Sequence, residues 1–359
     1  MTDAKKQWEI YTETELSILG PLLAKQGIEL DYNQPHISGE RFLMSGKKVV
    51  LIGKSIDSGE RLIIKSSADV SGIGEIEKER LVRQTLEKLP FAYSPLLAPK
   101  ERWFDKNDNR IIVVTEFIDQ PKPYLSLPLI EQFDLAIQAF KMLESAHVTT
   151  AGHKKIIKNI FSIWSAESYQ KQAILFAQEV KSDEVVKTLQ DCLAELSNRH
   201  EDIERYCGFL THDDFALHNF RFRDKVIYLI DQSSLIFGNK HESWARFLNY
   251  MLLYNRELGQ ALLQYLKDNV AEEELASLRL LRIYKVMELL NYYSKATNQS
   301  GGDVLALSKR RIVFWHYVLI QLLTGKTIEE SAIISYQKDR DRLRSEEEVA
   351  RQRELQQLV

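Results

Sequence analysis

One loop of the chain carries the residues whose types and spacing best suit chemistry. His212 is followed by Asp214 two positions later and by Asn219 five positions after that, and an apolar run over 226–230 then ends at Asp231. Phosphoryl transfer needs a carboxylate that orients and deprotonates the attacking hydroxyl, and hard oxygen ligands that hold Mg²⁺ on the phosphates. Asp214 suits the first role, and Asn219 and Asp231 suit the second. The strand predicted between them would bring Asp231 back beside the loop.

This stretch resembles the catalytic motif of the aminoglycoside phosphotransferase and choline kinase-like family, which reads His-Gly-Asp-x-x-x-x-Asn and then Ile-Asp-Phe or Ile-Asp-Trp. The chain departs from that motif at Asp213, where the family prefers Gly, at Gln232, where it prefers an aromatic residue, and at residues 216–218, which are Ala-Leu-His. No departure removes a catalytic group. The resemblance implies a protein kinase-like fold, ATP and Mg²⁺ as cofactors, Asp214 as the catalytic base, and a small-molecule hydroxyl as the phosphate acceptor. From the residues alone, the alternative is a solvated Asp-rich loop before an ordinary strand.

The order of predicted elements indicates an α+β bilobal fold, with a β-rich N-lobe before a helical C-lobe. Alternating and apolar runs predict strands over Ile37–Leu43, Lys48–Ser55, Arg61–Ser66 and Arg110–Ile118, and helical spacing predicts a helix over Glu75–Leu89. A Pro-containing break at residues 119–123 is the expected crossover between the lobes. We therefore expect a nucleotide-binding N-lobe over residues 1–118, a C-lobe with the catalytic loop over 119–336, and a charged C-terminal tail over 337–359.

Lys65 is the candidate phosphate-binding lysine. It ends a strand and would face inward together with Ile63, because strand side chains alternate with a period of two. A buried lysine needs an anion, which ATP phosphates and a helix glutamate would supply. By the family resemblance Glu79 is the preferred partner, and Glu75 is its competitor. The alternative is an edge-strand lysine in solvent.

Two further nucleotide contacts are expected from position in the fold. The backbone from Glu116 to Ile118 would pair with adenine. The turn over residues 44–47 is Met-Ser-Gly-Lys rather than a glycine-rich loop, and it is equally consistent with a phosphate-covering loop and a plain hairpin turn. The family resemblance also implies that His212 organises the catalytic loop through hydrogen bonds to the backbone.

The acceptor site has one candidate residue and one alternative. On the helix predicted over residues 273–293, Glu288 shares a side with Tyr284 and Tyr292, so a carboxylate among aromatic rings would hold a cationic amine or a hydroxyl. The alternative is a solvent-facing glutamate paired with Lys285 or Arg282. The tail over residues 337–359 has few apolar residues and is expected to be an exposed, fraying helix.

The composition limits the class of protein. The 359 residues are 44% hydrophobic and 28% charged, as in ordinary globular proteins, and a net charge of −3 argues against a nucleic-acid partner. Cys192 and Cys207 have no metal-binding spacing. The polar N-terminus and the short apolar run over 312–323 predict neither a signal peptide nor a membrane span, so we expect a cytoplasmic protein.

Two rival functions remain open at this point. One is a catalytically inactive kinase-like nucleotide-binding or scaffold protein, which the glycine-poor loop and the departures at Asp213 and Gln232 favour. The other is an unrelated helical interaction protein whose motif arises by chance. The first would bind ATP without turnover, and the second would not bind ATP.

Overall fold

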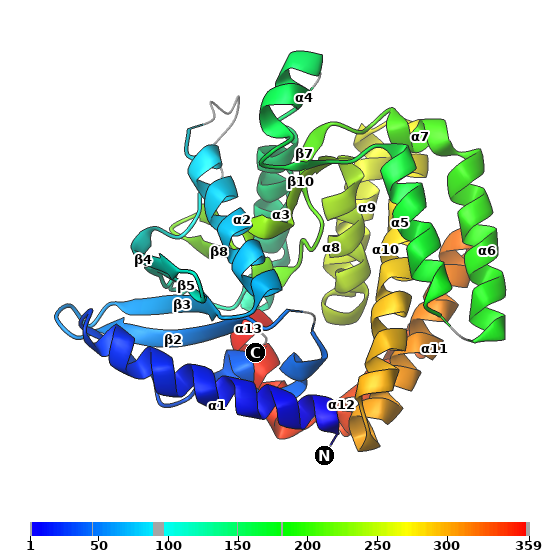
Figure 1. The fold of residues 1–359 in the computed structure, drawn as a ribbon. Coiled ribbons are helices and arrows are strands. Elements are labelled where there is room, and N and C mark those ends of the chain that lie inside the picture. The colour runs from blue at the N-terminus through cyan, green and yellow to red at the C-terminus, as the bar shows by residue number, and fades with distance from the viewer. Residues whose placement is uncertain (1, 45, 89–96, 149, 181, 357–359) are drawn as a thin grey trace.

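The computed structural model describes residues 2–44, 46–88, 97–148, 150–180 and 182–356 of the chain. A β-sheet lobe formed by the first third of the chain lies beside a larger helical lobe (Figure 1). The α+β, bilobal, kinase-like fold expected from the sequence is therefore confirmed.

The N-lobe is built on a five-stranded sheet with strand order β1-β2-β3-β5-β4, in which all neighbours are antiparallel. Its elements are α1 (Asp3–Ala24), β1 (Ile28–Leu30), β2 (Val49–Ser55), β3 (Arg61–Ser67), α2 (Val70–Leu86), β4 (Glu101–Asn107) and β5 (Arg110–Glu116). Alternation along β3 separates the two faces of the sheet. Leu62 and Ile64 pack in a buried cluster with Leu19 of α1, whereas Ile63 and Lys65 lie on the opposite face, toward the C-lobe.

The prediction of a strand over Ile37–Leu43 is wrong. This segment forms two 3₁₀ helices, η1 (Pro35–Ile37) and η2 (Gly39–Leu43). Pro35 lacks a backbone N–H, and Gly39 has φ of +60°, a conformation that favours glycine, so the segment cannot pair as a regular strand. β1 takes the expected place beside β2, and residues 31–48 form a long connection instead of a hairpin turn. Ser45, part of the predicted turn, lies outside the described residues.

Helix α2 begins earlier than the helix predicted over Glu75–Leu89. The side chain of Asp69 caps it by accepting hydrogen bonds from the backbone N–H groups of Ser71 and Gly72. The helix ends at Leu86, and Leu89 lies outside the described residues.

The C-lobe consists mainly of helices with short strands around the catalytic loop. Its helices are α3 (Leu129–Glu144), α4 (Ala151–Ile157), α5 (Ala166–Gln178), α6 (Asp183–Asn198), α7 (His200–Glu204), α8 (His241–Tyr254), α9 (Arg256–Asn269), α10 (Glu272–Gln299), α11 (Gly302–Thr324), α12 (Glu330–Leu343) and α13 (Glu346–Gln356). Its strands are β6 (Ser162–Ile163), β7 (Phe209–His212), β8 (Phe220–Arg223), β9 (Val226–Leu229) and β10 (Leu235–Gly238), with 3₁₀ helices η3 (Tyr124–Ser126), η4 (Leu217–Asn219) and η5 (Gln232–Ser234). In the described chain, no helix combines the length and apolar character needed to span a bilayer.

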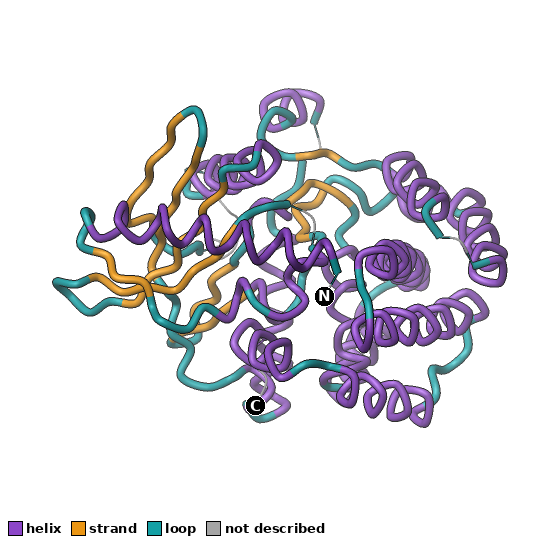
Figure 2. The backbone as a smooth tube through the Cα atoms, turned by 60° about the horizontal axis from the view of Figure 1, so that its bottom comes forward, coloured by secondary structure: helices purple, strands orange, loops and turns teal. Residues whose placement is uncertain are grey.

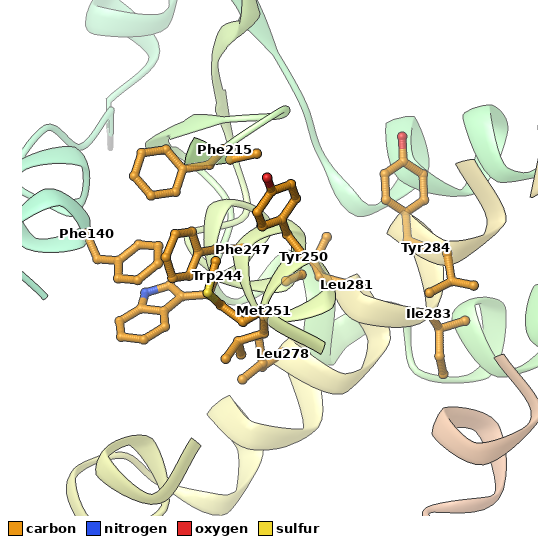
Figure 3. Close-up of a cluster of buried hydrophobic side chains, with 14 of the residues drawn as sticks. Phe140, Phe215, Trp244, Phe247, Tyr250, Met251, Leu278, Leu281, Ile283 and Tyr284 are labelled. Atoms are coloured by element: carbon orange, nitrogen blue, oxygen red, sulfur yellow. The ribbon is translucent and has the colours of Figure 1, made fainter. Parts of the chain in front are cut away.

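Aromatic rings of the C-lobe core anchor the catalytic loop (Figure 3). Phe215, the residue after Asp214, is almost fully buried, and its ring lies 5.3 Å from that of Phe140. Phe140 in turn stacks on Trp244 at a centroid distance of 3.7 Å. Aromatic packing of this kind contributes free energy beyond area burial, and it fixes the backbone of the loop against α3 and α8.

The expectation that the C-terminal tail is exposed is wrong for one face of its last helix. Helix α13 lies between the sheet lobe and the helical lobe (Figures 1 and 2). Glu348 is fully buried, and Arg351 and Gln352 are more than nine-tenths buried. The buried face of α13 is polar and is held by hydrogen bonds centred on Glu348, so a search for an apolar face does not find it.

Candidate active site

A cavity of about 360 Å³ lies between the two lobes. All the residues to which the sequence assigns a catalytic, nucleotide-binding or metal-binding role line it: Lys65, Glu79, Glu116, Ile118, Asp214, Asn219 and Asp231. The fold therefore brings together positions that are up to 166 residues apart in the chain (231 − 65 = 166).

Lys65 of β3 pairs with Glu79 of α2, with Nζ 2.5 Å from Oε1. Both side chains are mostly buried, at 13% and 7% exposed. Glu75, the competing candidate, pairs instead with Lys48. Lys48 was missed by the sequence analysis, although its spacing of two from Val50 places both on the cavity face.

Asp231 follows β9, and its carboxylate lies near two lysines of the cleft. Its φ of 60° is left-handed, and Ser233 Oγ donates to its Oδ1 at 2.6 Å. Burial alone would raise the pKa of this carboxyl, but Lys48 and Lys65 outweigh burial and lower the pKa to about 2. Nε2 of His212 lies 3.1 Å from the backbone oxygen of Asp231, so His212 organises the loop through the backbone, as predicted.

Asp214 is held by three side chains. Arg246 donates from Nε to Oδ1 at 2.7 Å, Nε2 of His218 lies 3.0 Å from Oδ2, and Asn219 Nδ2 donates to Oδ2 at 3.1 Å. Burial acts to raise the pKa of Asp214, but the charges of Arg246 and His218 hold it well below its usual range. Sequence reasoning missed both residues: His218 lies four positions from Asp214, whereas Arg246 comes from the separate helix α8.

Asn219 and Asp231 have the chemistry of a magnesium site. Asn219 Nδ2 also donates to the backbone oxygen of Asp214 at 2.8 Å, which leaves Oδ1 as the atom of that amide able to bind a metal. Within the described residues, no group of three or more His, Cys, Asp or Glu side chains is placed to hold a metal alone. Magnesium at nucleotide sites commonly takes one or two protein oxygens together with phosphate oxygens, and this pair fits that pattern.

The end of β5 and the residues just after it line the cavity. Backbone N–H groups of Glu116 and Phe117 donate to the oxygens of Lys100 and Arg61, at 2.9 and 3.0 Å. Ile118 also lines the cavity and is the first residue beyond these contacts. Adenine pairing along Glu116–Ile118 stays a prediction.

Glu288 has a partner that the sequence analysis named as the alternative. Its Oε2 lies 3.0 Å from Nζ of Lys285, and the side chain is 40% exposed. Lys285 also pairs with the buried Glu242 at 3.0 Å. Tyr292 lines the cavity, whereas Glu288 is not among the described residues that do.

Asp213, the residue before the proposed base, has a perturbed carboxyl. Burial, opposed by Lys285, raises the pKa of Asp213 to about 7.

Comparison with known proteins rests on structure, since no family model and no curated protein matches the chain. The fold is similar to a thermostable mutant of aminoglycoside phosphotransferase APH(4)-Ia in ternary complex with AMP-PNP and hygromycin B, with TM-score 0.54, 14% identity, and coverage of 76% of this chain and 91% of that one. It is also similar to macrolide 2'-phosphotransferase type I, with TM-score 0.54, 15% identity, and coverage of 83% and 97%. This chain has an aminoglycoside phosphotransferase-like kinase fold.

A third solved structure of this fold is the amicoumacin kinase hAmiN in complex with AMP-PNP, Ca²⁺ and Ami. Its TM-score is 0.53 at 13% identity, covering 87% of this chain and 96% of that chain. At these identities the likeness establishes the kinase-like fold, and the chemistry has to be argued from the residues in the cleft.

Proposed function

We propose that the protein is an ATP-dependent phosphotransferase that moves the γ-phosphate of ATP to a hydroxyl of a small molecule. The observation that carries this proposal is that Lys65, Asp214 and Asp231 line one cavity between two lobes. The kinase-like fold supports it, because solved structures of the same fold include complexes with AMP-PNP.

In this proposal each side chain has one role. Lys65, fixed by Glu79, binds the phosphates, and the backbone of residues 116–118 binds adenine. Asn219 and Asp231 hold Mg²⁺, which neutralises charge on the phosphates when it is bound. Asp214 orients the acceptor hydroxyl and takes its proton as transfer proceeds.

The short chain after Asp231 favours a small acceptor. Only η5 and β10 separate Asp231 from α8, which begins at His241. A protein kinase has a longer activation segment after the corresponding Asp, and that segment supports the peptide substrate. The proposed acceptor class is therefore a small-molecule alcohol.

Purified protein with Mg-ATP tests the proposal directly. We expect ATP to raise the melting temperature in a Mg²⁺-dependent manner, and a screen of amino sugars, macrolides, sugars and amino alcohols to find an acceptor that drives ADP release. ATP binding without turnover for any acceptor would instead favour the catalytically inactive kinase-like protein. No ATP binding would contradict both.

A further inference from the structure

Beside the catalytic loop, helix α13 and the connection over residues 31–48 form a part of the cleft wall that has no role in the proposed function. Helix α13 packs against η1, η2 and η4, so it joins the connection over residues 31–48 to the loop that carries Asn219. The backbone N–H of Glu40 donates to Oε2 of the buried Glu348 at 2.8 Å. A Cβ on Gly39 would lie 2.9 Å from the Cα of Glu348, so the two segments are in direct backbone contact.

This contact brings two arginines to the cavity, Arg41 from η2 and Arg351 from α13. They are 7% and 8% exposed. Arg351 is paired with Glu348, with Nε 2.8 Å from Oε2. His36 and Tyr292 also line the cavity.

Arg41 is the unusual member of the pair. Its Nη2 donates to the backbone oxygens of Gly46 and Lys48 at 3.3 and 3.0 Å, and its guanidinium lies 4.9 Å from the ring of Trp8. Nη1 is buried and has no hydrogen-bond partner in the described part of the chain. Among the described residues, no ion pair joins Arg41 to a carboxylate.

A desolvated guanidinium without an anion is costly, because it has lost the water that stabilised its charge. The positive charge of a neighbouring arginine adds to that cost. Burial and the nearby Arg351 lower the pKa of Arg41, with Glu75 opposing them. Burial, followed by Arg221 and Arg351, lowers the pKa of His36 to about 4, so His36 is neutral at pH 7. A bound phosphate or carboxylate would supply the anion that Arg41 lacks, and the planar fork of arginine matches both groups.

We propose that Arg41 and Arg351 form an anion-binding subsite of the cleft, completed by the C-terminal helix, that takes a phosphate or carboxylate group. Two sources have this chemistry: the terminal phosphate of the bound nucleotide, or an anionic group carried by the acceptor. The subsite stands on its own geometry, whereas its use in catalysis rests on the proposed function.

Titration with inorganic phosphate tests the subsite in the full-length protein. Binding would be measured by calorimetry and by thermal stabilisation in three states: without nucleotide, with saturating Mg-ADP, and with saturating Mg-AMP-PNP. We expect phosphate to bind with Mg-ADP present. Loss of this binding with Mg-AMP-PNP would assign the subsite to the terminal phosphate, and retained binding would assign it to the acceptor.

Arg41→Gln and Arg351→Gln should each weaken phosphate binding in the Mg-ADP state by on the order of 10-fold, the usual effect of removing one charged hydrogen-bond partner. Arg353→Gln is the matched control, since it removes an exposed charge from α13 two positions from Arg351. If Arg41→Gln does not fold, Arg41→Lys keeps the charge but loses the fork, and it should also weaken binding.

Two results would overturn the subsite: no phosphate binding in any state, or equal binding by wild type and the Arg41 and Arg351 variants. Failure of the proposed function is a different outcome, because it would appear as absent Mg-AMP-PNP binding in the wild type. In that case the titration without nucleotide would still show whether Arg41 and Arg351 bind phosphate.

Discussion

Arg246 donates from Nε to Oδ1 of Asp214 at 2.7 Å, and the two side chains are 17% and 37% exposed. The proposed base is therefore kept ionised: burial acts to raise its pKa, but Arg246 and His218 outweigh burial and hold the pKa low. A carboxylate with a low pKa is a weak base. In the proposed reaction it would act mainly by orienting the hydroxyl, which suits a loose transition state in which the hydroxyl loses its proton late.

Substitution of Arg246 should change the pH dependence of turnover. Arg246→Gln removes the cation that lowers the pKa of Asp214, so the acidic limb of the kcat profile should move to higher pH, and kcat at neutral pH should fall by about 10-fold. Arg246→Lys should restore part of the shift. If Arg246→Gln lowers kcat without moving the acidic limb, Arg246 only supports the fold of the loop.

Substitution of Asp231 and substitution of Asp214 should have different effects on ATP binding. Asp231→Asn should lose turnover and Mg²⁺-dependent ATP binding, because Asp231 is proposed to bind the metal. Asp214→Asn should lose turnover by on the order of 10²–10⁴-fold while keeping Mg-ATP binding, because it is proposed to touch only the acceptor. Ligand-induced melting shifts report the binding, and ADP release reports the turnover. Wild-type turnover by Asp214→Asn would contradict the assignment of the base.

Lys65 should contribute to nucleotide binding, and Glu79 should act through it. Lys65→Ala should weaken Mg-ATP binding by about 10-fold or more, because the phosphates lose a charged hydrogen-bond donor. Glu79→Gln should have a smaller effect of the same sign. Lys54→Ala is the matched control, since Lys54 lies on the adjacent strand, is 50% exposed and pairs with Glu29. Equal affinities for wild type and Lys65→Ala would make Lys65 a structural residue.

The sequence identified those parts of the cleft whose geometry is local. Asp214 and Asn219 lie in one loop, and a strand with a period of two fixes the face of Lys65. Arg246 and Arg351 could not be found in this way, because each comes from a distant helix through tertiary packing: Arg246 contacts Asp214, and Arg351 lines the cleft. The false strand at residues 37–43 has a different cause, since its apolar residues suggested a strand that Pro35 and the left-handed backbone of Gly39 prevent.

Asp213 should make stability fall with rising pH. Its pKa of about 7 in the folded protein lies above the ordinary 3.8, so between these values the folded state binds a proton that the unfolded state does not, and stability decreases as pH rises toward 7. Asp213→Asn removes this dependence. The stability of Asp213→Asn relative to wild type should therefore increase by about 3 kcal/mol from pH 5 to pH 8. Urea unfolding at both values measures it, and a pH-independent difference would show that Asp213 titrates normally.

The C-terminal helix should stabilise the cleft, contrary to the expectation from its composition. Glu348 is fully buried and accepts hydrogen bonds from Glu40 N–H, Arg351 and Gln352. Glu348→Gln leaves Arg351 buried without its anion, so it should cost about 3 kcal/mol of unfolding free energy.

Glu347→Gln is the matched control, because Glu347 is the exposed neighbour on the same helix and its substitution should have little effect. Ending the chain at Ser345 should lower the melting temperature more than Glu348→Gln does, and it should remove the thermal stabilisation by phosphate, because Arg351 is lost and the connection over residues 31–48 loses its contact with α13. Unchanged melting temperatures for both the point variant and the truncation would show that α13 is not docked between the lobes in solution.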